Sequence, residues 1–384
     1  MRRRTRSTAH HHRLGFTLIE LLVVIVILGL LVGLLVPAVM QAVGTAKDAA
    51  VAAEIRALSQ ALADFNSKYG AYPPSRIVLR EDGNYSSTGA LGARTVSYLR
   101  RFWPRMPVST TGAPTGIPGG FYDFNRNGKL DTDVSYILSG PECLVFFLGG
   151  IAQGNSTGGW SMTGFSKNPL NPFEILTTNR TVPLFEFNNS RLEANKSNGA
   201  VFPGYLDSLG NSYDSTQPFY CYFSAYGGAG YDPGDVDFAE LNDDGVAMIG
   251  AFKTSNAATP PAGQSIVVGS PAPNPYTNDP PVPTQNAAGK GDVDTDSPKY
   301  PAWQNGQTFQ IISAGRDRRF GIGGQYLANG NNRLPFVDGN TSGYLQNSFQ
   351  TMQANATVTS VTLGPNTRSV EKDNITNFSA GKLD

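Results

Sequence analysis

The sequence predicts an α+β protein in which one long N-terminal helix, first transmembrane and then amphipathic, packs on an antiparallel β-sheet head with large loop insertions. An apolar stretch that starts at Phe16 passes without a break into an amphipathic pattern that ends at Tyr69. After Ile77 the pattern changes to short apolar runs between Gly, Pro, Asn and Asp residues, which is typical of strands joined by turns. The predicted parts are a leader (1–15), the helix (16–70) and the head (71–384).

The leader is short, polar and basic. It contains no acidic residue and five arginines, namely Arg2, Arg3, Arg4, Arg6 and Arg13. The apolar stretch that follows has about the 20 residues that a helix needs to cross the hydrocarbon core of a membrane. Because a basic flank keeps the N-terminus in the cytoplasm, we expect residues 16–40 to cross the cytoplasmic membrane once and the head to be extracytoplasmic.

Two simpler interpretations of this segment account for less of it. An ordinary secretory signal peptide has a shorter apolar region, followed by a small-x-small cleavage site, and no convincing site of this kind follows the span here. A plain signal anchor leaves Glu20 unexplained, because a carboxylate inside an apolar span costs about 2.5–3.5 kcal/mol on insertion scales. Glu20 is either an acid that is tolerated near the membrane interface or an acid that needs a partner. The sequence within the span offers no such partner.

The residues from Gly15 to Glu20 resemble the prepilin signal of type IV pilins and type II secretion pseudopilins, and Pro37 stands where many pilins have a helix-kinking proline. The resemblance implies that a prepilin peptidase cleaves between Gly15 and Phe16 and methylates the new amino terminus. It also implies that Glu20 faces the amino group of Phe16 in a neighbouring subunit of a helical filament. An inner-membrane assembly platform is then a further partner.

An amphipathic stripe continues the helix beyond the membrane. Its apolar residues recur every three or four positions, at Val51, Ile55, Leu58, Leu62, Phe65 and Tyr69, and this spacing predicts a face packed under the head. Gly70 and the pair Pro73–Pro74 end the helix. Residues 66–73 resemble the helix exit of the G-type pseudopilins, the major subunits of type II secretion.

The head is expected to contain short strands and one long insertion. The apolar runs predict strands or core segments at 136–138, 144–148, 183–187, 219–223 and 309–312. Residues 254–307 are rich in Pro, Gly, Ala, Asn and Asp, and this composition predicts a flexible insertion.

Three further segments resemble the G-type pseudopilins, in the order in which that family has them. Residues 207–213 resemble a D-x-W-G-N-P-Y turn, from which Leu209 and Ser212 depart. Residues 309–317 resemble a strand and turn of the pattern S-x-G-x-D-G, with Arg318 in place of the last glycine. Residues 373–378 resemble a D-D-I-x-N-W ending. The resemblance implies a pilin fold whose head is much enlarged by insertions.

One loop has the residue pattern of a calcium site, D-x-N-x-N-G-x-Φ-D. Asp123, Asn125 and Asn127 supply oxygens at alternate positions, Gly128 permits a sharp bend, and further oxygens come from the Lys129 carbonyl and, through a water molecule, from Asp131. Val134 takes the twelfth position, where such loops have a bidentate glutamate. The alternative is a turn rich in Asn and Asp that is held by its own backbone.

A second calcium site follows from the resemblance alone. G-type pseudopilins bind calcium near their C-terminal loop, and the matching residues here are Asp317 and Asp373. More than forty residues separate these two positions, and several arginines surround the first one.

Cys143 and Cys221 are the two cysteines of the chain. Their separation matches no metal-binding motif. In an oxidising compartment they have two possible states, a disulfide or two separate core residues.

The composition limits the classes of function. All three histidines lie in the leader, so the rest of the chain contains neither a Ser-His-Asp system nor a histidine metal ligand. Without the leader, 25 basic residues face 30 acidic ones, which disfavours nucleic acid as a partner. We therefore expect no enzyme but a structural pseudopilin of a type II secretion or type IV filament-like machine. The alternatives are a membrane-anchored or filament-borne binding or adhesion module that uses the enlarged head and, least favoured, an anchored hydrolase.

Overall fold

The computed structural model of the chain describes residues 17–154, 159–175, 177–193, 201–209, 219–225, 231, 265–267, 274–277, 304–318, 320, 323–325, 372–379 and 382–383. The predicted leader and the cleavage position between Gly15 and Phe16 lie outside these residues. The chain divides into two compact units, Met1–Lys47 and Asp48–Asp384.

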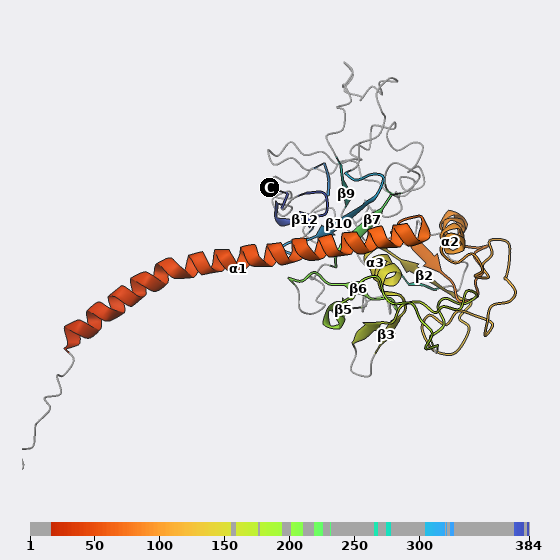
Figure 1. Cartoon of the computed structure of the whole chain (residues 1–384), viewed down its shortest axis with the longest axis horizontal. Coiled ribbons are helices and arrows are strands. Elements are labelled where there is room, and N and C mark those ends of the chain that lie inside the picture. Colours follow the sequence, from red (N-terminus) through yellow and green to blue (C-terminus); the bar gives the residue numbers. More distant parts are fainter. Residues whose placement is uncertain are drawn as a thin grey trace, which may run out of the picture. The chain divides into compact units, whose positions relative to one another are not determined.

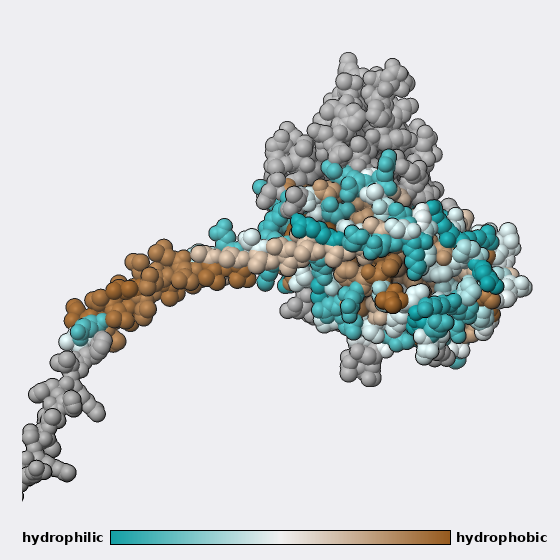
Figure 2. Space-filling model, viewed as in Figure 1, coloured by the Kyte–Doolittle hydropathy of each residue, from teal (hydrophilic) through white to brown (hydrophobic). Residues whose placement is uncertain are grey.

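The helix α1 (Leu18–Tyr69) is continuous and includes Pro37 (Figure 1). In the first unit its large apolar side chains from Leu18 to Val43 are exposed, and Figure 2 shows the visible face of this stretch as strongly hydrophobic. By length and composition this helix can cross a membrane. A proline inside a soluble helix is destabilising, but it is tolerated in transmembrane helices.

In the second unit, α1 has one buried face. Five of the six residues of the predicted stripe, from Val51 to Phe65, are fully buried, and Tyr69 packs against the same core. The helix ends at Tyr69, as predicted, because Gly70 turns the chain with a φ of +74° while its N–H still bonds the Asn66 carbonyl at 2.7 Å.

The head contains short elements. In chain order they are β1 (Ile77–Leu79), α2 (Gly89–Phe102), β2 (Val134–Leu138), α3 (Gly140–Gly149), β3 (Ala152–Gly154), β4 (Trp160–Met162), the 3₁₀ helix η1 (Asn189–Arg191), β5 (Leu192–Glu193), β6 (Gly204–Tyr205), β7 (Cys221–Ser224), β8 (Ser265–Val267), β9 (Asn274–Thr277), β10 (Phe309–Ser313), β11 (Gly323–Gln325) and β12 (Ile375–Thr376).

The strands form several small sheets. The main ones have the strand orders β1-β2-β8 and β12-β10-β7, and two-stranded ribbons pair β3 with β4, β5 with β6 and β9 with β11. Most neighbours are antiparallel, while β8 joins β2, and β11 joins β9, in parallel. The predicted α+β class, with a long N-terminal helix and antiparallel strands, is confirmed.

Two of the segments predicted as strands or core segments are not strands. Residues 144–148 are a core segment, because they belong to α3, a helix whose residues are all buried. Its start is set by Ser139, whose N–H donates to Glu142 at 3.2 Å, and by Pro141 in the first turn. Residues 183–187 form no strand, because the Leu184 N–H bonds the carbonyl of Leu148 at the end of α3 instead. The helix α2 was not expected.

The segment 254–307, predicted as a flexible insertion, contains β8 and β9, so the prediction of a loop is wrong at these strands. Tyr276 in β9 is buried. The Gln310 side chain of β10 binds both the N–H and the carbonyl of Tyr276, each at 2.8 Å. The Gln310 side chain thus links β9 to β10, although the two strands share no backbone ladder. Amino-acid composition alone does not reveal such a contact. Most of the remaining insertion lies outside the described residues.

Two apolar clusters form the core of the second unit. The larger one joins the buried stripe of α1 to β1, α2, β2 and α3, and it contains Cys143. The smaller one surrounds Phe223, Tyr276 and Ile312 and contains Cys221. Both cysteines are buried, and no disulfide joins them in the structure.

Candidate functional site

The start of α1 is a capping box, which the sequence analysis missed. The carboxylate of Glu20 accepts hydrogen bonds from the Thr17 N–H at 2.8 Å and the Thr17 hydroxyl at 2.7 Å, and the Glu20 N–H donates back to Thr17 Oγ1 at 3.3 Å. The finding that Glu20 has no partner near it in the sequence is therefore wrong. The pattern Thr-x-x-Glu before an apolar run is the sequence signal of this motif.

A second glutamate of α1 lies in the head-packed part of the helix. The Glu54 carboxylate receives both terminal nitrogens of Arg191, each at 2.8 Å, and the hydroxyls of Tyr205 and Tyr220 at 2.8 and 2.6 Å. Burial raises the pKa of this carboxyl, but the hydrogen bonds and charge of Arg191, together with the two hydroxyls, hold it below its usual value. This cluster fixes η1, β6 and the residue that precedes β7 to the helix.

The three pseudopilin-like segments of the head come together in the structure. Asp207, of the first segment, is buried and binds the hydroxyl of Ser313 in the second. Asp373, at the start of the third, accepts the backbone N–H groups of Arg316 and Asp317 at 2.6 and 2.9 Å. Farther along the third segment, Asn377 bonds the backbone of β10.

The second predicted calcium pair, Asp317 and Asp373, is thus brought together across the intervening residues. One oxygen of Asp373 is occupied by two backbone N–H groups, and the Arg316 side chain bonds Asp48 on α1. Lys382 also bonds Asp48, at 3.0 Å. Calcium at this pair stays a prediction.

The predicted calcium loop, residues 123–131, folds around its own polar groups. Asp123 Oδ2 accepts the Gly128 N–H at 3.1 Å, and Gly128 has a φ of +70°. The oxygens of Asn125 and Asn127 accept backbone N–H groups two residues ahead, at 3.0 and 2.8 Å. The amide nitrogens of both asparagines donate to Asp131 Oδ2. The five residues named by the sequence therefore belong to one closed loop.

A carboxylate from outside the loop completes this arrangement. Glu81, which follows β1, is fully buried, and its oxygens accept the N–H groups of Phe124 and Asp131 at 3.1 and 3.0 Å. The Tyr136 hydroxyl lies 3.5 Å from Glu81 Oε1. Burial raises the pKa of Glu81, against the lowering effect of the backbone hydrogen bonds. Glu81 was not predicted from the sequence, because no local pattern links it to a loop some fifty residues away.

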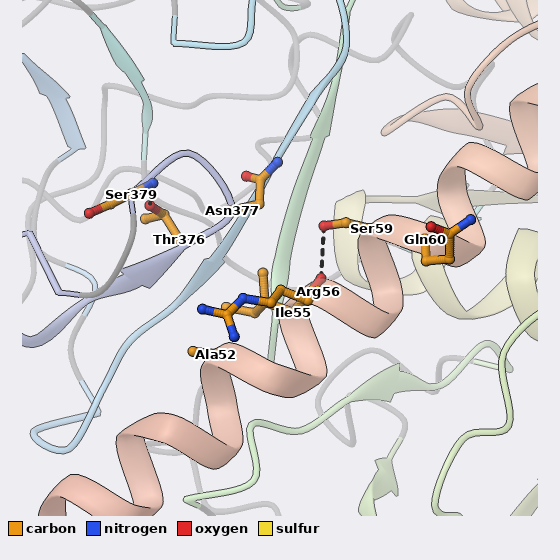
Figure 3. A pocket seen from close by; sticks show the side chains of 8 residues that line it. All are labelled: Ala52, Ile55, Arg56, Ser59, Gln60, Thr376, Asn377 and Ser379. Carbon is orange, nitrogen blue, oxygen red and sulfur yellow. Dashed lines mark hydrogen bonds between the residues drawn. The ribbon is translucent and has the colours of Figure 1, made fainter.

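A groove of about 280 Å³ lies between α1 and the end of β12 with the residues that follow it (Figure 3). Its walls are formed by Ala52, Ile55, Arg56, Ser59, Gln60, Thr376, Asn377 and Ser379. Arg56 is the one charged residue among them. The groove is smaller than most small-molecule sites, which measure about 300–1,000 Å³, and its walls hold no acid–base pair.

The described residues contain no group of three or more His, Cys, Asp and Glu side chains arranged to hold a metal ion. A site built from such side chains alone is therefore not found in this part of the chain. The 123–131 loop differs in kind, because amide and carbonyl oxygens supply most of its potential ligands.

Comparison with known proteins identifies the N-terminal segment. Residues 10–36 match a family model described as the prokaryotic N-terminal methylation motif. No curated protein and no solved structure matches the chain.

The matched motif and the fold support the same conclusion. The chain carries a type IV pilin-like precursor signal, which implies processing by a prepilin peptidase and assembly with other pilin-type subunits. The exposed apolar part of α1 is consistent with anchoring by a single membrane-spanning helix.

Proposed function

We propose that this protein is a structural subunit, a pseudopilin of the G type with an enlarged head, in a type II secretion or type IV filament-like machine of the inner membrane. The methylation motif over residues 10–36 carries the proposal. The convergence of the three pseudopilin-like segments on β10 supports the G-type assignment, because segments far apart in the sequence meet as parts of one structural unit.

In this role the peptidase cleaves between Gly15 and Phe16 and methylates Phe16. The Glu20 carboxylate then has two tasks. Within the chain it caps α1 through Thr17, and in the filament it opposes the amino group of Phe16 in a neighbouring subunit. The charge of the carboxylate matters for the second task and is dispensable for the first, because glutamine also serves in a capping box.

The described surface of the head favours a structural role over adhesion. Its exposed large apolar side chains are Leu130 and Val182, and neither is aromatic. The aromatic residues of the described part lie mainly in the core, as the ring contacts around Phe102 and Phe173 show. Aromatic side chains grouped on one exposed face would favour a binding module instead.

Mass spectrometry of the membrane-extracted protein tests the processing. The expected N-terminus is methylated Phe16. An intact Met1, or a terminus beyond residue 35, would contradict the proposal.

Two variants of Glu20 separate its two tasks. We expect Glu20→Gln to be processed normally and to retain the helix cap, yet to be lost from filaments sheared from the cells. Thr17→Ala is the matched control, because it weakens the cap and leaves the charge. Incorporation of Glu20→Gln at the wild-type level would show that Glu20 acts through the cap alone.

A further inference from the structure

We propose that the loop Asp123–Asp131 is a calcium site in the head and that Glu81 is its positioning residue. This inference does not depend on the proposed function, since it concerns only the second compact unit. The loop supplies oxygens from Asp123, Asn125, Asn127, the Lys129 carbonyl and Asp131.

One carboxylate oxygen in the loop has no hydrogen-bond donor. Asp123 Oδ1 is shielded from solvent and has no hydrogen-bond partner, while Oδ2 of the same carboxylate accepts the Gly128 N–H. A buried polar atom in this state is costly, and an anionic one especially so. A cation in the loop supplies what this oxygen lacks.

The charges around the loop are mainly negative. Glu81, Asp123 and Asp131 lie on or against the same loop, and none of them takes part in a salt bridge within the described residues. Arg126 is near enough to Asp123 for their charges to interact. The three carboxylates therefore carry more negative charge than this one cation offsets.

The oxygens of the loop suit calcium by their chemistry. All the potential ligands are hard oxygens, which is what Ca²⁺ prefers. The Asn125 and Asn127 oxygens each accept one backbone N–H, and a carbonyl oxygen has a second lone pair available for a cation. A bound cation competes with the two amide N–H groups that now contact Asp131.

Glu81 acts on the geometry of the loop. Its two oxygens bond the N–H groups of Phe124 and Asp131, which are the second and ninth residues of the loop. One buried side chain therefore holds both halves of the loop at a fixed separation. Since Val134 offers no ligand and starts β2, we expect an affinity in the range of extracellular calcium modules, with a Kd of about 10⁻⁴–10⁻³ M.

Calorimetric titration of the detergent-solubilised full chain with calcium chloride tests the proposal. We expect one site in the wild type and much weaker binding of magnesium, which requires a stricter octahedral geometry. Asp123→Asn, which preserves the shape of the side chain and its bond to Gly128, should lose detectable binding. Asp133→Asn, a change of an exposed carboxylate in the next turn, is the matched control and should bind like the wild type.

Glu81→Gln tests the positioning role. Its amide oxygen can accept one of the two backbone N–H groups, but its NH₂ group opposes the other, so calcium affinity should fall about 10- to 100-fold. Absence of binding in the wild type, or equal binding by Asp123→Asn and Asp133→Asn, would overturn the site. A lower melting temperature of Glu81→Gln with unchanged affinity would overturn the role of Glu81.

Discussion

The two parts of α1 use the same secondary structure for opposite purposes. From Leu18 to Val43, large apolar side chains are exposed all around the helix, while from Val51 to Phe65 one stripe is buried and the other faces are polar. Each part also has its own glutamate. Among the described residues, Glu20 bonds Thr17, three residues away, whereas Glu54 bonds Arg191, Tyr205 and Tyr220, which lie more than a hundred residues away in the sequence.

This difference shows where the stability of the head originates. The contacts of the first part are local, so they define where the helix starts and contribute little to the folding of the second unit. The contacts of the second part are distant in sequence, so they tie the head together. Changes in the two parts should therefore have separable effects.

The largest effect is expected at Phe65, which is fully buried and has ring contacts with Phe102 and Phe147 at 5.1 and 5.7 Å. Phe65→Ala should lower the free energy of unfolding of the head by about 3–5 kcal/mol, because it leaves a cavity. Denaturant unfolding followed by near-ultraviolet circular dichroism in detergent measures this. Leu28→Ala, in the exposed part, is the control and should change the value by less than about 0.5 kcal/mol. Similar losses of unfolding free energy in both variants would contradict the difference between the two parts of α1.

The next effect concerns Glu54. Glu54→Ala leaves the half-buried Arg191 without its carboxylate, and breaking such a pair costs about 3 kcal/mol or more. The control is Asp64→Ala, an exposed acid of the same helix that bonds Gln60 at 3.0 Å. If Arg191→Ala costs as much as Glu54→Ala and the double variant no more than either, the ion pair acts as one unit. Additive losses would contradict this.

A smaller effect is expected from pH. Burial raises the pKa of Asp207 to about 6, against an ordinary value of 3.8. The folded state therefore binds this proton more tightly than the unfolded state. Protonated Asp207 therefore stabilises the folded state by about 3 kcal/mol at most. This stabilisation is complete below pH 3.8 and is lost as the pH rises to about 6.

Melting temperatures between pH 4 and pH 7 test this expectation. Asp207→Asn should flatten the pH dependence and be more stable than the wild type at pH 7, since a neutral side chain retains a partner for Ser313. The exposed Asp64→Asn is the control. An unchanged slope in Asp207→Asn would assign the pH dependence to other groups.

Some features could be predicted because their signals are local. The periodic stripe predicted the buried face of α1 and its end at Tyr69, and the alternation of turns and apolar runs predicted β2, β7 and β10. The apolar run 144–148 is a core segment, as predicted, but a helix and not a strand, because a buried helix and a buried strand have the same composition. The cap at Ser139 and Glu142, which distinguishes them, is also a local signal. The capping box at Thr17 and Glu20 was missed in the same way.

The sequence by itself determined the anchor. The leader, the apolar span and the methylation motif lie next to one another in the sequence, so the anchor can be identified from consecutive residues alone. The positions of the calcium loop residues were also readable, because they are closely spaced.

Only the tertiary structure decided which distant groups meet. Glu81 lies against Asp131 and Phe124, Arg191 lies against Glu54, and Asp373 lies against the turn after β10. These contacts depend on how the core places one segment beside another. Such packing depends on the whole apolar surface of the chain and not on a single motif. For this physical reason the anchor can be predicted from the sequence, while the partners of the buried charged groups can be identified only in the folded structure.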